Sequence, residues 1–245
     1  MRVLALNGSP RLKNSNTDRV LQPFLRGARE AGAETETVYV GSLNIKPCKG
    51  CFGCWVKTPG ACVQKDDMAV MLEKLVAADV IVYAAPLYVL GFPGHFKNLI
   101  DRTIPLAEPW LVQAEGSDIT SHPSRHGKSG KAFLISVAGF PERKHFEPLV
   151  LMMERWCELA NRELLGKILV PASETLRRPE MQALFQWYFD AARQAGLELV
   201  RDGRVSDETQ AVLDCKLFDV PPGRLVADAD ETESGRVIPG SKASN

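Results

Sequence analysis

The stretch that decides the fold is RVLALNGSPRLKNSNT, residues 2–17. Residues 2–6 form a compact apolar run that predicts a short buried strand. Residues 16–31 have helical periodicity, so the segment between them joins a strand to the start of a helix. Gly8 lets the chain leave the strand sharply. Backbone N–H groups at a helix N-terminus can hold an anion, which makes this loop a candidate anion site.

The loop is rich in groups that bind phosphate. It offers three hydroxyl groups, one amide and one cation, from Ser9, Ser15, Thr17, Asn16 and Arg11. It lacks the two-glycine, lysine and hydroxyl pattern of nucleoside triphosphate loops, and also the three spaced glycines of dinucleotide loops. We therefore expect a single phosphate monoester, bound without a metal. The alternative is a hydroxyl-rich helix cap that holds no ligand.

Further along the chain, short apolar runs alternate with segments of helical periodicity. Strands are expected at residues 35–40, 79–84, 132–137 and 164–170. Helices are expected from residue 67, over 95–104, from 146 to 160, and as one long stripe from 181 to 199. Five short strands separated by helices predict an α/β fold, with a parallel sheet covered on both faces.

The composition predicts one cytoplasmic domain with appendages. The chain has 245 residues, 45% of them hydrophobic, and its 30 basic residues balance 30 acidic ones. That balance does not suggest nucleic acid or an anionic membrane as a partner. No apolar run approaches the roughly 20 residues that span a bilayer. The first residues show no signal-peptide cleavage pattern, so we expect a cytoplasmic protein.

Three further segments carry a family resemblance. APLYVLG follows the third expected strand at residues 85–91, FKNLIDR lies at 96–102, and VAGFP follows the fourth strand at 137–141. Together with GSPR and SNT of the first loop, they closely resemble the NADPH-dependent FMN reductase group of the flavodoxin superfamily. The resemblance implies a flavodoxin-like, doubly wound five-stranded sheet in the order 2-1-3-4-5, with its ligand where the strand order reverses. It also implies FMN as cofactor and NAD(P)H as co-substrate.

In that group the first loop holds the FMN phosphate, and two later loops surround the isoalloxazine ring. The resemblance assigns ring contacts to Pro86, Leu87, Tyr88, Val89, Leu90, Ala138 and Gly139. This chain departs from the pattern at residue 90, where relatives carry glycine, and in the last loop, which has one glycine where relatives often have two. We expect Asp101 and Arg102 to form an ion pair at a helix end that holds the ring loop.

Four of the six cysteines crowd into one segment, at Cys48, Cys51, Cys54 and Cys62. Spacings of three residues let thiols converge on one centre, and in a reducing compartment such crowding indicates metal, cluster or redox chemistry. Four thiolates suit a [4Fe–4S] cluster. The spacing resembles the compact motif of the iron–sulfur flavoproteins, a branch of the same FMN group. Redox-active thiols and a structural zinc site are the alternatives.

The expected domain organisation has one large unit and a terminal extension. Residues 1–218 are expected to form the FMN-binding domain, with a cysteine-rich loop at 46–66, a surface excursion at 108–131 and a C-terminal helical extension. Residues 219–245 have no periodic apolar stripe and are expected to be a flexible tail or an oligomerisation arm. The family resemblance implies a homodimer or homotetramer.

The expected function is an FMN-dependent oxidoreductase that takes electrons from NAD(P)H. It would pass them to a quinone, a nitroaromatic compound, another flavin or a protein, through FMN and a [4Fe–4S] cluster. A bound flavin supplies the chemistry itself, so we name no catalytic side chain. The alternatives are an electron carrier reduced by a ferredoxin-like donor, and a flavin-binding redox sensor.

Overall fold

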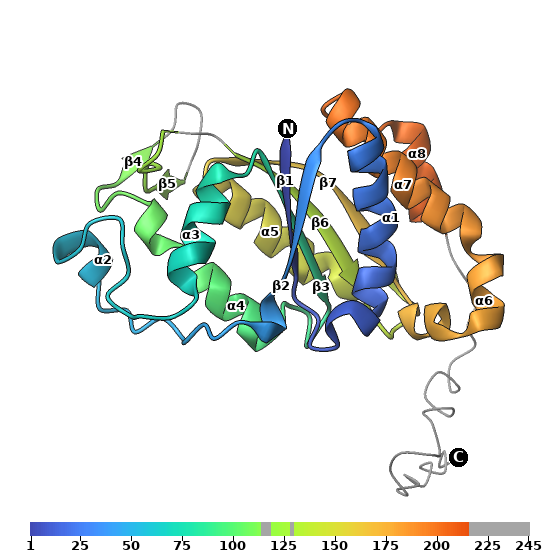
Figure 1. The fold of residues 1–245 in the computed structure, drawn as a ribbon, viewed down its shortest axis with the longest axis horizontal. Coiled ribbons are helices and arrows are strands. Elements are labelled where there is room, and N and C mark those ends of the chain that lie inside the picture. The colour runs from blue at the N-terminus through green and yellow to red at the C-terminus, as the bar shows by residue number, and fades with distance from the viewer. Residues whose placement is uncertain (114–118, 128–129, 216–245) are drawn as a thin grey trace, which may run out of the picture.

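The computed structural model describes residues 1–113, 119–127 and 130–215. Its centre is a parallel five-stranded sheet in the order β2-β1-β3-β6-β7, shown in Figure 1. The strands are β1 (Arg2–Asn7), β2 (Glu34–Tyr39), β3 (Val80–Pro86), β6 (Gly130–Val137) and β7 (Arg162–Val170). This is the predicted 2-1-3-4-5 order of a flavodoxin-like fold.

Helices cover both faces of the sheet. On one side lie α1 (Asn16–Glu30), α7 (Gln186–Arg201) and α8 (Asp207–Asp214) (Figure 1). On the other side lie α3 (Met68–Ala77), α4 (Gly94–Asp101) and α5 (Glu147–Leu159). The central strand β3 feeds both cores, because its side chains alternate between faces. Val82 packs in the core under α1 and α7, whereas Tyr83 packs in the core under α3, α4 and α5.

The predicted strands are all present, and their bounds differ from the expected ones by at most two residues. The single helix expected over 181–199 is wrong: the structure has α6 (Pro179–Leu184) and α7, separated at Phe185, whose backbone leaves the helical conformation. The helix expected over 95–104 ends at Asp101 and is followed by a 3₁₀ turn, Ile104–Leu106. Helix α8 belongs to the expected C-terminal helical extension, although its bounds were not predicted; Ser206 caps it by accepting a hydrogen bond from the Thr209 N–H.

The two irregular segments lie on the same side of the molecule in Figure 1. The cysteine-rich loop contains the short helix α2 (Gly53–Val56). The expected surface excursion contains the antiparallel pair β4 (Val112–Gln113) and β5 (Thr120–Ser121). The Trp55 indole N–H donates to the Ala107 carbonyl at 2.9 Å and ties the two segments together. Residues 219–245 lie outside the described residues. None of the described helices is both long enough and apolar enough to cross a membrane.

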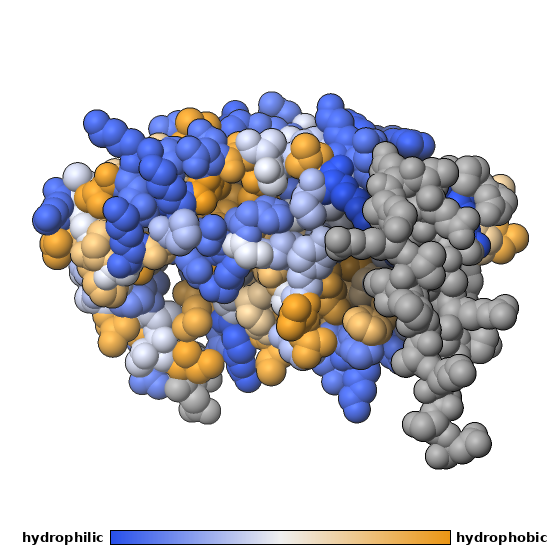
Figure 2. All heavy atoms as spheres, turned by 90° about the horizontal axis from the view of Figure 1, so that it is seen from below, coloured by the Kyte–Doolittle hydropathy of each residue, from blue (hydrophilic) through white to orange (hydrophobic). Residues whose placement is uncertain are grey.

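The topology brings three loops to one edge of the sheet. β1 and β3 pair from Val3 opposite Val80 to Asn7 opposite Ala84, and β3 pairs with β6 as far as Pro86 opposite Val137. The loops that follow these strands therefore emerge side by side. Figure 2 shows the molecule from the side to which these strand ends point, and on that face apolar patches lie among polar ones.

Candidate functional site

The loop after β1 is built around the start of α1. Ser9, Ser15, Asn16 and Thr17 are all buried. Ser15 is the helix cap: its hydroxyl accepts from the Asp18 N–H at 3.1 Å and donates to the Leu12 carbonyl at 2.7 Å. The Ser9 hydroxyl accepts from the Arg11 N–H at 3.3 Å. Part of the loop is thus an ordinary cap, as the alternative interpretation holds.

The cap does not use every donor. The first N–H groups of a helix have no partner within it, and Ser15 takes up those of Asp18 and Arg19. The N–H groups of Asn16 and Thr17 remain at the open end of the helix. The Thr17 hydroxyl is also buried, with no hydrogen-bond partner in the described part of the chain. A buried polar group without a hydrogen-bond partner destabilises the folded protein by about 1–3 kcal/mol. The donors present fit an anionic oxygen, such as one of a phosphate group.

Gly8 is required by its surroundings. A Cβ at this position would lie 2.3 Å from Phe96 Cδ2 and 3.0 Å from Ala85 Cβ. The ring of Phe96 therefore holds the loop against the sheet. The neighbouring His95 contacts the Gly8 carbonyl through Nε2 at 2.9 Å. Helix α4 thus contacts the loop through His95 and Phe96. The sequence did not predict this role for His95.

A buried carboxylate organises the back of the loop. Asp18 Oδ1 accepts hydrogen bonds from Asn7, Gln22 and Tyr39 at 3.0–3.1 Å. Asn7 in turn accepts from the Ser9 N–H at 2.9 Å. Burial, and then the hydrogen bond to Asp18, raise the pKa of Tyr39 to about 12. This network turns the Asp18 carboxylate toward neutral donors and fixes the position of Ser9.

Arg11, the predicted cation of the loop, points elsewhere. Its guanidinium lies 3.5 Å from a carboxylate oxygen of Glu174, and both side chains are about half exposed. Glu174 belongs to the 3₁₀ turn Ser173–Arg177 that follows β7. In this structure Arg11 links two loops at the rim, and the buried hydroxyls and amides form the interior of the site.

The ring loop after β3 is a strained two-residue turn. Tyr88 and Gly91 exchange backbone hydrogen bonds of 2.9 and 3.0 Å. Val89 and Leu90 form the turn, with φ of +47° and +64°. Such turns favour Asn and Gly, because left-handed backbone is costly for residues with branched side chains. Val89 is fully exposed and Leu90 is 46% exposed, so the turn presents two apolar side chains at the site.

The loop after β6 lies next to it. Ala138 is buried, whereas Gly139 is exposed and has open space where a side chain would be. The Leu87 N–H donates to the Val137 carbonyl at 2.8 Å and joins the two loops. Phe140, 60% exposed, packs on the His145 ring with centroids 4.5 Å apart. The structure therefore gathers the predicted ring-contact residues at one sheet edge.

The four clustered cysteines surround a single space. Cys48, Cys51, Cys54 and Cys62 line a cavity of about 90 Å³, together with Arg102, Ile104 and Pro105. Roughly 10–15 Å³ already holds one water molecule. Burial, with the neighbouring thiols adding to it, raises the pKa of Cys54. No three Cys, His, Asp or Glu side chains of the described residues converge closely enough to hold one metal ion. Four thiols around one space of this kind fit the ligand set of a [4Fe–4S] cluster.

The expected ion pair between Asp101 and Arg102 is wrong. Asp101 pairs with Lys97, one helical turn earlier. Arg102 instead reaches Asp66 through two hydrogen bonds of 2.8 and 2.9 Å, and both side chains are buried. Hydrogen bonds from Arg102 hold the pKa of the Asp66 carboxyl below its ordinary value. Arg102 therefore secures the cysteine-rich loop, which begins and ends near Lys46 and Asp66.

Helix α4 connects the two candidate sites. It begins directly after the ring loop, where His95 contacts the loop of Gly8. It ends beside the cavity of the four cysteines, where Arg102 follows its last residue. Eight helical residues span roughly 12 Å. One short rigid element thus positions both sites.

Comparison with known proteins decides the family. The model of the NADPH-dependent FMN reductase family matches residues 1–130. The chain belongs to this family. The matched part includes the loop of Gly8, the ring loop and all four clustered cysteines.

Relatives with similar sequences are iron–sulfur flavoproteins. An iron–sulfur flavoprotein of Methanosarcina thermophila is 39% identical over 133 residues, 54% of this chain and 68% of that protein. One from Archaeoglobus fulgidus is 41% identical over 103 residues, 42% of this chain and 49% of that protein. The matched stretches thus cover 68% of the first relative and 49% of the second.

Solved structures show the same fold at low sequence identity. An FMN-dependent NADH-azoreductase from Bacillus anthracis in complex with FMN has a TM-score of 0.60 at 14% identity, covering 81% of this chain and 99% of that one. An NAD(P)H:quinone oxidoreductase from Methanothermobacter marburgensis has a TM-score of 0.59 at 18% identity, covering 81% and 96%.

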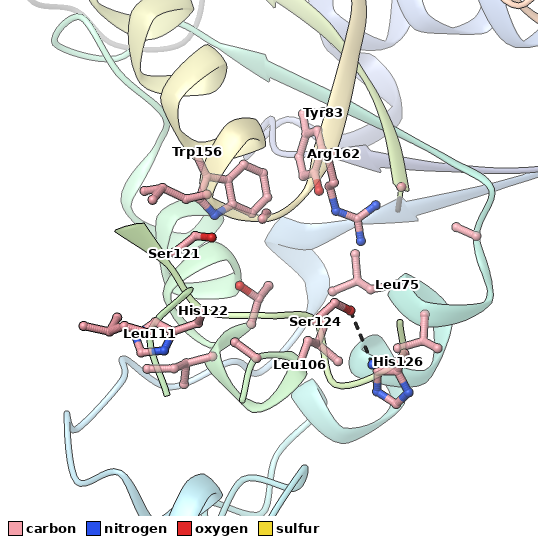
Figure 3. Close-up of a pocket in the computed structure, with 18 of the residues that line it drawn as sticks. Leu75, Tyr83, Leu106, Leu111, Ser121, His122, Ser124, His126, Trp156 and Arg162 are labelled. Carbon is pink, nitrogen blue, oxygen red and sulfur yellow. Dashed lines mark hydrogen bonds between the residues drawn. The ribbon is translucent and has the colours of Figure 1, made fainter. Parts of the chain in front are cut away.

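A larger cavity of about 290 Å³ lies at the opposite end of the sheet, and none of the predicted site residues lines it. Figure 3 shows Tyr83 and Trp156 along one wall, and Ser124 and His126 across from them. The rings of Tyr83 and Trp156 meet edge to face, 5.0 Å apart. Ile104 borders both this cavity and that of the cysteines. The sequence did not predict this cavity, because its walls come from five separate segments.

Proposed function

We infer that this chain is an FMN-dependent oxidoreductase that takes electrons from NAD(P)H and carries a [4Fe–4S] cluster in its cysteine-rich loop. The observation that carries the inference is the buried Thr17 hydroxyl, which has no partner among the described residues and lies in the first turn of α1, where backbone N–H groups lack partners within the helix. Membership of the FMN reductase family supports the cofactor. The relatives named iron–sulfur flavoproteins support the cluster.

The residues present assign a role to each loop. Ser9, Ser15, Asn16 and Thr17 would hold the phosphate, with Arg11 at the rim. The turn of Tyr88, Val89 and Leu90, with Pro86, Leu87, Ala138 and Gly139, would enclose the ring. When bound, FMN supplies both hydride and single-electron chemistry, so the protein contributes position and electrostatics. The exposed apolar tip of the ring loop would exclude water from one side of the ring.

The cysteine ligands are testable by iron content. Replacing Cys51 with Ser should abolish bound iron and acid-labile sulfide while FMN remains bound, because the two sites lie at opposite ends of α4. Cys215→Ser is the matched control, since Cys215 is exposed and outside the cavity. Iron unchanged in Cys51→Ser contradicts this ligand set. Bound zinc in place of iron, or reversible disulfide formation without metal, would favour one of the two alternatives.

An electron carrier is the second candidate. Cys48 and Cys51 are exposed, and the adjacent Phe52 is 50% exposed. A protein donor could therefore approach the cysteine cavity from outside. Stopped-flow reduction separates the candidates: rapid flavin reduction by NADPH or NADH supports the enzyme, whereas reduction by a ferredoxin-like protein alone supports the carrier. Steady turnover with neither donor would indicate a redox sensor.

The physiological acceptor and the assembly belong to the same proposal. Quinones, nitroaromatic compounds, free flavin and protein acceptors are each compatible with a ring site open at the sheet edge. We propose a homodimer or homotetramer. Light scattering of the full chain tests this, and a monomer at working concentration would refute it.

A further inference from the structure

Arg102 places a buried positive charge at the wall of the cysteine cavity. Its side chain is 1% exposed and lines the cavity with the four cysteines. Nη1 and Nη2 donate to Asp66, and Nη1 also donates to the Lys46 carbonyl at 2.7 Å. Nε is buried and has no hydrogen-bond partner within the described residues. Within the described residues, this guanidinium therefore keeps one donor, Nε, without a partner, on a side chain that lines the cysteine cavity.

The ion pair is arranged asymmetrically about the cavity. Arg102 lines it, whereas Asp66 does not. Cys62 lies next to the guanidinium and contributes to its electrostatic environment. The cationic partner thus faces the thiols, and the carboxylate lies behind it. The positive end of this ion pair would therefore lie closer than its negative end to any centre bound by the four thiolates.

A charge in this position has a defined effect on a cluster. Four thiolates make such a centre anionic, and each added electron increases its negative charge. A nearby cation stabilises the reduced state more than the oxidised one, and the interaction is strong because the side chain is shielded from water. Hydrogen bonds to the sulfurs act in the same direction. The balance of these effects determines the reduction potential.

We propose that Arg102 tunes the reduction potential of the cluster, raising it through its charge and its free Nε–H. The proposal rests on the cluster inferred above and assigns Arg102 a tuning role, in addition to holding the loop. A purely structural ion pair would stabilise the loop without affecting the potential. The test must therefore measure the potential itself.

The main variant is Arg102→Gln with Asp66→Asn. It replaces a buried ion pair by neutral amides of similar size and leaves the net charge unchanged, so it avoids an unpaired buried carboxylate. Arg102→Lys keeps the charge and removes the Nε donor. Lys97→Gln is the control, because it removes a half-exposed cation from the same helix. Iron and sulfide content are measured first, and the midpoint potential is then measured by EPR-monitored redox titration without air.

We expect the double variant to make cluster reduction at least tenfold less favourable, a negative shift of about 59 mV for one electron. Arg102→Lys should shift the potential less, and Lys97→Gln should leave it unchanged. Equal potentials in the wild type and both Arg102 variants would overturn the role of Arg102 and leave the cluster intact. If the double variant loses iron, Arg102→Lys tests the hydrogen-bond contribution alone, and a wild-type potential in that variant overturns the role of the Nε–H. A wild-type protein without iron would overturn the cluster, and this role with it.

Discussion

Replacing Thr17 with valine separates a phosphate site from an ordinary helix cap. The Thr17 hydroxyl is buried, with no partner in the described part of the chain, while Ser15 provides the cap. Valine keeps the shape of the side chain and removes only the hydroxyl. If the loop binds phosphate, FMN binding should weaken. If the hydroxyl has no ligand, the only effect should be on stability.

The expected changes in FMN affinity and in folding stability have opposite signs. A hydrogen bond to a charged group contributes about 1.5–3 kcal/mol, so FMN affinity should fall by roughly 10- to 100-fold. In the protein without FMN, the variant removes a buried group that costs about 1–3 kcal/mol when unpaired. The free energy of unfolding should therefore stay equal or rise by about 1 kcal/mol. A variant that binds its ligand less tightly while folding at least as stably is the signature of a ligand site.

Two comparisons make the assay specific. FMN and riboflavin share the ring but differ in the phosphate, so riboflavin affinity should not change in Thr17→Val. Thr209→Val is the matched control, because the buried Thr209 hydroxyl donates to Glu198 at 2.8 Å. That variant should lose about 1.5–3 kcal/mol of stability and bind FMN normally. Flavin fluorescence titration and urea unfolding measure both quantities. Unchanged FMN affinity, or an equal loss for FMN and riboflavin, would refute the assignment.

Three further predictions address the loops. In Gly8→Ala the new Cβ would lie 2.3 Å from the Phe96 ring, so stability should fall by about 1–3 kcal/mol and FMN affinity with it; wild-type values in both titrations would contradict the close packing. Replacing Val89 with Asn and Leu90 with Gly should stabilise the protein by about 1–2 kcal/mol, because left-handed backbone is costly for both residues; an unchanged urea midpoint would argue against strain. The raised pKa of Tyr39, about 12, predicts that its contribution is complete below its unfolded value of about 10 and is lost as pH rises to 12. The stability difference between wild type and Tyr39→Phe should shrink across that range, and a constant difference would contradict it.

The sheet and the first loop could be predicted because their signals are local. Short apolar runs bounded by polar turns mark the strands, and the alternation with helices determines a parallel sheet. The hydroxyls of Ser15 and Thr17 identify a helix start from neighbouring residues alone. The structure is needed to show that Ser15 caps the helix while the Thr17 hydroxyl has no partner in the described part of the chain.

What the sequence could not provide are contacts between distant segments. Arg102 and Asp66 are 36 residues apart, and the local pattern favoured the neighbouring Asp101 instead. His95 supports a loop 87 residues earlier. The strained turn at Leu90 was visible only as a departure from the glycine expected there. Each of these depends on which side chains the fold brings together.

The most direct test is to purify the protein without air and measure its absorption spectrum, with flavin, iron and acid-labile sulfide determined on the same sample. The account predicts FMN bands over a broad iron–sulfur shoulder, with about four irons per chain. Flavin without iron would retain the FMN site and refute the cluster. A protein that binds no flavin even after incubation with FMN would contradict the central claim.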